Sequence, residues 1–149
     1  MSAPTQLRPA PGAAPSQPRR VLLWPLRIVL VPYAALLVAQ PVLAGRFLEG
    51  SYEALKPHGA IGGGIIPLTW IVCAAAFLAW RPGRFSPFPL VASGLLSVLT
   101  VVQVVAGYNR SLGVHLPLGV AIVATGLAML GWAWSPRRLG TRPARVGAP

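Results

Sequence analysis

Four long apolar segments constrain this chain more than any other feature. They cover residues 28–48, 58–80, 87–107 and 114–134. Each has the roughly 20 residues that a helix rising about 1.5 Å per residue needs to cross a hydrocarbon layer about 30 Å thick. Over the whole chain, 54% of the residues are hydrophobic and 10% are charged. These values exclude a large soluble core and predict an all-α integral membrane protein, a four-helix bundle with the lipid bilayer as its first partner.

The charged residues are distributed unevenly between the two ends of these segments. Both tails and the link after the second segment carry ten arginines and no acidic residue: Arg8, Arg19, Arg20, Arg27, Arg81, Arg84, Arg137, Arg138, Arg142 and Arg145. The other two links carry Arg46, Lys56 and Arg110 together with both acidic residues of the chain, Glu49 and Glu53. The positive-inside rule therefore predicts that both termini face the cytoplasm. The net charge of +11 is explained as a topology signal, so no nucleic-acid partner is expected.

Composition divides the chain into three parts. Residues 1–20 and 135–149 are rich in proline and lack apolar periodicity, which predicts two disordered tails, the second one basic. Residues 21–134 then form the transmembrane domain. A signal peptide ending at Ala44 is a rival interpretation of the first segment, but its apolar run is longer than a usual signal core. Twelve arginines against one lysine are typical of a GC-rich bacterial genome, which indicates a bacterial cell membrane.

The two halves of the transmembrane domain share an order of residues, which predicts a bundle built from two repeated hairpins of the same orientation. In each half a glutamine on the outgoing segment is followed by a histidine at the start of the returning segment and by a glycine four residues later. The first half has Gln40, His58 and Gly62, and the second has Gln103, His115 and Gly119. These are the only two histidines of the chain. We expect them at the same depth near the outer face, on opposite sides of the bundle axis.

Two facing imidazoles inside a helix bundle are typical ligands of a haem iron, so His58 and His115 are predicted metal ligands. Gly62 and Gly119, one turn away, would leave room for the macrocycle, with Gly59, Gly63 and Gly64 widening the space. Candidate partners of the propionates lie in the outer links: Arg46, Arg110, Lys56, Tyr52 and Tyr108. Gln40 and Gln103 could bond each other, the backbone or a ligand edge. The alternatives stay open that the histidines are solvated interfacial residues, the glycines close-packing surfaces and the glutamines links between helices.

These motifs resemble one four-helix half of the haem A synthase family, and small actinobacterial four-span membrane proteins that correspond to such a half. The resemblance covers residues 21–134, with a returning helix that carries His58 and another in which Leu-Pro-Leu-Gly follows His115. It implies that the two histidines ligate a b-type haem at the outer side of the membrane. The chain departs from the family where Leu55 replaces a glutamate three residues before His58 and Gly59 replaces an arginine. Synthesis of haem A by this chain alone is therefore not expected.

The sequence favours a non-catalytic haem b protein for electron transfer or haem handling, with quinone or a membrane oxidoreductase as candidate redox partner. The main alternative is a cofactor-free structural or accessory membrane subunit, and a homo-oligomer is compatible with either. A transporter or channel is disfavoured because no acidic residue lies inside a span. An enzyme acting on lipid or quinone lacks a nucleophile and base pair. The single cysteine, Cys73, is expected to be a packing residue.

Overall fold

A computed structural model describes residues 21–82 and 85–135, and within these ranges the chain forms four long helices and no strand. The helices are α2 (Trp24–Leu48), α3 (Leu55–Trp80), α4 (Phe88–Tyr108) and α5 (Leu112–Trp134), with a short 3-10 turn, η1 (Tyr52–Ala54), before α3. All four are long and apolar enough to cross a membrane. The prediction of an all-α, multi-pass membrane bundle is therefore confirmed.

The predicted span 87–107 lies within one residue of α4 at both ends. The other three predicted spans lie inside α2, α3 and α5, each of which begins a few residues before the span. Pro25 and Pro89 occupy the first turns of α2 and α4, where a missing backbone N–H costs nothing. Further prolines lie inside α2, α3 and α5 without ending them: Pro32, Pro41, Pro67 and Pro117. Membrane helices tolerate such prolines because neighbouring helices and local adjustments satisfy the freed backbone groups. The predicted disordered tails, 1–20 and 135–149, lie outside the described residues except for Ser135.

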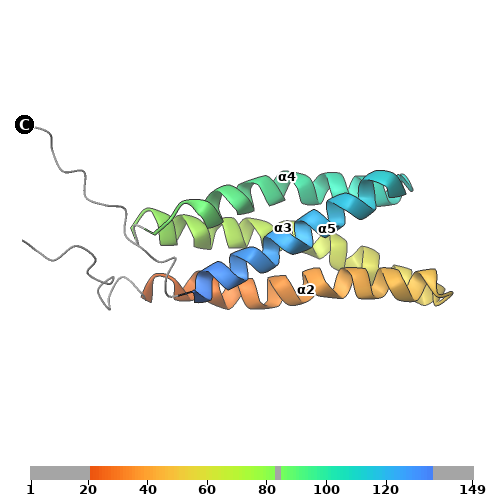
Figure 1. The fold of residues 1–149 in the computed structure, drawn as a ribbon, viewed down its shortest axis with the longest axis horizontal. Coiled ribbons are helices and arrows are strands. Elements are labelled where there is room, and N and C mark those ends of the chain that lie inside the picture. The colour runs from red at the N-terminus through yellow and green to blue at the C-terminus, as the bar shows by residue number, and fades with distance from the viewer. Residues whose placement is uncertain (1–20, 83–84, 136–149) are drawn as a thin grey trace, which may run out of the picture.

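The helices are arranged as an antiparallel ring (Figure 1). α2 packs against α3 and α5, and α4 packs against the same two helices, so α3 and α5 lie on one diagonal of the bundle. We call the end that carries Trp24, Trp80, Trp132 and Trp134 the tryptophan end, and the end that carries His58, His115, Arg46 and Arg110 the histidine end. The cytoplasmic location of the tryptophan end and the duplication of the two hairpins stay predictions.

The half of the bundle toward the tryptophan end is closely packed. Nearly all fully buried apolar side chains belong to it, with Leu26 and Leu30 on α2, Val72 on α3, and Met129 on α5 among those with no exposed surface. On α5 the backbone at Gly126 comes so close to Leu37 that an added Cβ would overlap its side chain. Burial of these side chains and close helix approach therefore hold this half together.

The half toward the histidine end has almost no buried core. Apart from Ala54 and Ala106, no described residue is buried between that end and a set of four residues, one on each helix. Those four residues, which we call the floor residues, are Leu37 (2% exposed), Ile65 (2%), Thr100 (4%) and Ile122 (4%). Figure 1 shows the reason: α5 lies near α2 at the tryptophan end and crosses the bundle to run beside α4 at the other end. Between the floor residues and the histidine end, the α2–α3 hairpin therefore separates from the α4–α5 hairpin.

Candidate metal centre

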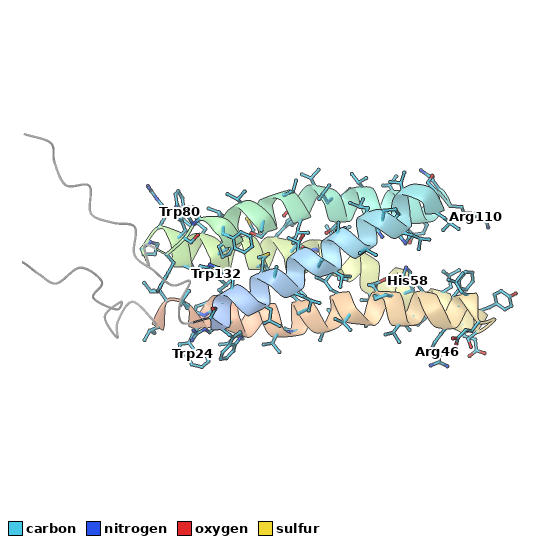
Figure 2. All side chains as sticks on the ribbon, in the orientation of Figure 1. Trp24, Arg46, His58, Trp80, Arg110 and Trp132 are labelled. Atoms are coloured by element: carbon cyan, nitrogen blue, oxygen red, sulfur yellow. The ribbon has the colours of Figure 1, made fainter. Side chains whose placement is uncertain are left out.

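The two histidines meet across the bundle. His58 is the fourth residue of α3 and His115 the fourth residue of α5, and both side chains are half-buried. Their ring centroids are 6.1 Å apart and the ring planes are inclined at 57°. Figure 2 shows His58 near the histidine end, between the α2–α3 and α4–α5 hairpins. Because α3 and α5 lie on a diagonal of the bundle, the two imidazoles approach each other across its interior and not between two neighbouring helices.

In both histidines the same ring nitrogen, Nδ1, hydrogen-bonds a backbone carbonyl oxygen. Nδ1 of His58 lies 3.2 Å from the carbonyl oxygen of Gln40, and Nδ1 of His115 lies 2.9 Å from that of Gln103. A carbonyl oxygen only accepts, so each bond requires the proton on Nδ1. When the rings are neutral, Nε2 carries the lone pair in both of them. Neutral imidazoles fixed in this tautomer are the form that binds a metal, and such bonds are the usual support of metal-ligating histidines.

The distance between the rings suits two ligands of one metal ion. A metal–imidazole bond is about 2.0–2.1 Å long and the ring centre lies roughly 1.2 Å beyond the nitrogen, so two imidazoles whose Nε2 atoms faced one ion from opposite sides would have centroids about 6.4 Å apart. The observed 6.1 Å is close to this value. The inclination of the planes is no obstacle, because axial rings can rotate about the metal–nitrogen bond.

Within the described ranges, no three His, Cys, Asp or Glu side chains gather into a group that could hold a metal ion. Two imidazoles alone leave the coordination of a bare zinc ion incomplete. A haem iron needs only these two from the protein, because the macrocycle supplies the other four nitrogens. The donor set of this chain therefore fits haem better than a free divalent ion.

The glycines near the histidines differ from expectation in what faces them. A Cβ on Gly119 would lie 2.8 Å from Nε2 of Gln103, and one on Gly62 would lie 3.9 Å from Nε2 of Gln40. The side chains of the preceding helix thus approach the two predicted glycines. Gly59, Gly63 and Gly64 are exposed and have no neighbour within 4 Å of such a Cβ, and their role in making room for a macrocycle stays a prediction.

Gly107 is a site residue that the sequence reasoning missed. A Cβ there would lie 2.9 Å from Cε1 and 3.1 Å from Nδ1 of His115. The imidazole therefore rests on the bare backbone of α4 one turn beyond Gln103. The sequence does contain a signal, since Gly107 follows Gln103 by four residues, but only the structure shows that the histidine ring covers it.

The glutamine side chains serve the helices differently. Nε2 of Gln40 donates to the carbonyl oxygen of His58 at 3.1 Å, which ties α2 to α3. Oε1 of Gln103 is buried without a partner, and so is the hydroxyl oxygen of Thr100, one turn deeper on α4. The two glutamines therefore bond the backbone or nothing, and not each other, among the described contacts.

The predicted propionate partners lie at the correct end but are not gathered at the histidines. Arg46 and Arg110 are exposed and lie at the histidine end (Figure 2), as are the exposed side chains of Tyr52, Tyr108 and Lys56. Neither guanidinium hydrogen-bonds a residue within the described part of the chain. Arg110 follows α4 with φ of 56°, a left-handed conformation that ends the helix before the turn into α5. Their role toward a ligand stays a prediction.

Comparison of the chain with protein-family models, with curated proteins and with solved structures finds no match. The assignment of a function therefore rests on the geometry of this chain.

Proposed function

We propose that this membrane protein binds a b-type haem between His58 and His115 and uses it for electron transfer or haem handling. The observation that carries the proposal is the meeting of the only two histidines of the chain, 6.1 Å apart, with both Nδ1 atoms bonded to backbone carbonyls. The resemblance of the motifs to the haem A synthase family points the same way.

The packing of the bundle supports this assignment. A porphyrin needs apolar surroundings and a gap between helices, and the half toward the histidine end has few buried side chains of its own, Ala54 and Ala106. In Figure 1 the ribbons of α2 and α5 diverge toward the histidine end.

A haem held by His58 and His115 would exchange single electrons and would leave no open position for oxygen. The chain's own residues set the conditions: the carbonyl groups of Gln40 and Gln103 fix the tautomer and the orientation of the rings, and apolar helices lower the local dielectric. Arg46 and Arg110 could pair with propionates if their flexible side chains turn inward. A lipid-soluble quinone or a membrane oxidoreductase is the natural partner of such a centre, because both reach it within the bilayer.

The test is an optical spectrum of the full chain purified in detergent and supplied with haem. We expect a reduced-minus-oxidised spectrum with the bands of a six-coordinate, low-spin b-type haem. The matched control is the double variant His58→Ala/His115→Ala, which should fold to the same helix content and bind no low-spin haem. If wild-type protein shows no such spectrum, or if the double variant shows it equally, the proposal is wrong.

One observation favours a second candidate, a cofactor-free structural or accessory subunit. Each Nδ1···O=C bond links neighbouring helices, α2 to α3 and α4 to α5, whether or not a metal is bound. On this alternative the histidines act only as interhelical bonds. Their replacement by asparagine, which can also donate to a carbonyl, should then preserve stability and every function of the protein.

A further inference from the structure

At the end of the bundle opposite the histidines, two tryptophans enclose an arginine. The guanidinium carbon of Arg27 lies 4.9 Å from the ring centre of Trp134 and 5.5 Å from that of Trp24. The two indole rings contact edge to face, with centroids 6.1 Å apart. Both distances to Arg27 are in the range of cation–π contacts. The three side chains join the first turn of α2 to the last turn of α5.

A hydrogen bond fixes the orientation of this guanidinium. Nε of Arg27 donates to the carbonyl oxygen of Ala133 at 3.0 Å, near the C-terminal end of α5. Arginine has five N–H donors, and this bond uses one. The four on the two terminal nitrogens are a planar fork that matches an oxyanion. Because Nε and the two ring faces hold the side chain, little further conformational entropy is lost when an anion binds.

The chain supplies no carboxylate side chain to this fork. It has two acidic side chains, Glu49 and Glu53, and both lie at the histidine end, after α2 and in η1. The C-terminal end of α5 contributes about half a negative charge, which neutralises Arg27 only in part. At a membrane interface the abundant oxyanion is the phosphate of a lipid headgroup.

We propose that Arg27, between Trp24 and Trp134, binds the phosphate of an anionic phospholipid at the junction of α2 and α5. Trp24 and Trp134 are 49% and 50% exposed, so their outer faces can contact the glycerol and the first methylenes of the same lipid. This lipid joins the first and last helices where the bundle is closed. The inference does not depend on haem.

The experiment measures binding of a short-chain phosphatidylglycerol to the full chain in neutral detergent micelles by calorimetry. Phosphatidylcholine of the same chain length and inorganic phosphate are the comparison ligands. We expect saturable binding of phosphatidylglycerol, at least roughly tenfold weaker binding in Arg27→Gln, as expected for the loss of charge-assisted hydrogen bonds, and an intermediate affinity in Arg27→Lys, which keeps the charge but not the fork.

The matched control is Arg81→Gln. Arg81 is also an interfacial arginine over a tryptophan, 5.3 Å from the ring of Trp80, but it is exposed and contacts one ring. This variant should bind phosphatidylglycerol within about twofold of wild type, a small effect of the kind expected for an exposed charge. If Arg27→Gln does not fold, judged by far-UV circular dichroism, Arg27→Lys and Trp134→Leu take its place, and both should weaken binding.

Three results would overturn the proposal. Equal affinity in wild type and the Arg27 variants would remove Arg27 from the site. An equal loss in Arg81→Gln would show that diffuse positive charge, and no particular residue, attracts the lipid. Displacement of the lipid by an equal concentration of inorganic phosphate, or equal binding of phosphatidylcholine, would show that an anionic phospholipid is not the ligand.

Discussion

In both hairpins the histidine ring hydrogen-bonds a backbone carbonyl oxygen, but the other contacts around the ring differ. In the α2–α3 hairpin the Nδ1···O distance is 3.2 Å and the side chain of Gln40 also bonds α3. In the α4–α5 hairpin the distance is 2.9 Å, and Oε1 of Gln103 has no partner. What the halves share is therefore a carbonyl acceptor. The difference teaches that the glutamine side chain is not what orients the imidazole.

The residue four positions after each glutamine explains part of this difference. In the second hairpin that residue is Gly107, which the ring of His115 covers. In the first hairpin it is Ala44, whose methyl group occupies the corresponding position on α2. A ring can approach the helix backbone more closely over glycine, and the shorter Nδ1···O distance is found in that half.

The largest expected effect comes from removing one ligand at a time. His58→Ala or His115→Ala should each abolish the low-spin spectrum, because loss of an axial imidazole opens the sixth position of the iron. The measurement is the optical spectrum with and without added imidazole, which should restore the low-spin form in both variants. A variant that keeps the wild-type spectrum identifies a histidine that is not a ligand.

Gly107→Ala should have the next largest effect. The added methyl group would lie 2.9 Å from Cε1 of His115, so the ring must move and its bond to Gln103 must lengthen. Overpacking of this kind costs about 1–3 kcal/mol, and we expect about a tenfold loss of haem affinity on titration, since 1.4 kcal/mol is a factor of ten. The control in the other hairpin is Ala44→Gly, which adds no atoms and should not weaken haem binding. Equal haem affinities in wild type and Gly107→Ala would contradict the close contact between the ring of His115 and the backbone at Gly107.

Replacement of the two glutamines by leucine should affect stability differently. Gln40→Leu removes the bond to the carbonyl oxygen of His58 and should lower the free energy of unfolding by about 1 kcal/mol. Gln103→Leu removes a buried oxygen that lacks a partner, so stability should be unchanged or higher. The measurement is unfolding in mixed micelles of increasing denaturing detergent. A greater loss in Gln103→Leu would show that its side chain has a partner.

The smallest effect is expected at the two glycines one turn beyond the histidines. Gly62→Ala places a methyl group at ordinary contact distance, whereas Gly119→Ala places one 2.8 Å from the amide of Gln103. Because that amide is the flexible end of a side chain, the difference in unfolding free energy should stay below about 1 kcal/mol. Adding Gln103→Ala to Gly119→Ala should remove this difference in unfolding free energy. If Gly62→Ala and Gly119→Ala are equally stable, the amide of Gln103 moves away from the added methyl group without a cost in stability.

Hydropathy was enough to predict the helices, and the order of residues in the two halves was enough to predict that the two histidines lie at the same end of the bundle. Long apolar segments leave few alternatives to spanning helices, so their number and approximate bounds follow from composition. The pairing of His58 with His115 followed from their repeated positions, and the structure brings the two rings together.

The contacts that hold the rings could not be read from the sequence. Every helical residue has a carbonyl group, so nothing marks those of Gln40 and Gln103 as acceptors in advance. The seat at Gly107 and the bond from Arg27 to Ala133 depend on the rotation and crossing of α5, which the apolar pattern of a membrane helix leaves undetermined because such helices are apolar on several faces.

The floor residues mark where the packed interior of the bundle begins. Beneath Leu37, Ile65 and Ile122 the interior is filled with closely packed, mainly apolar side chains as far as the tryptophan end. Such a filling is a low-dielectric barrier to charge. A haem bound at the histidine end would thus lie on one side of this barrier, nearer to one membrane face than to the other.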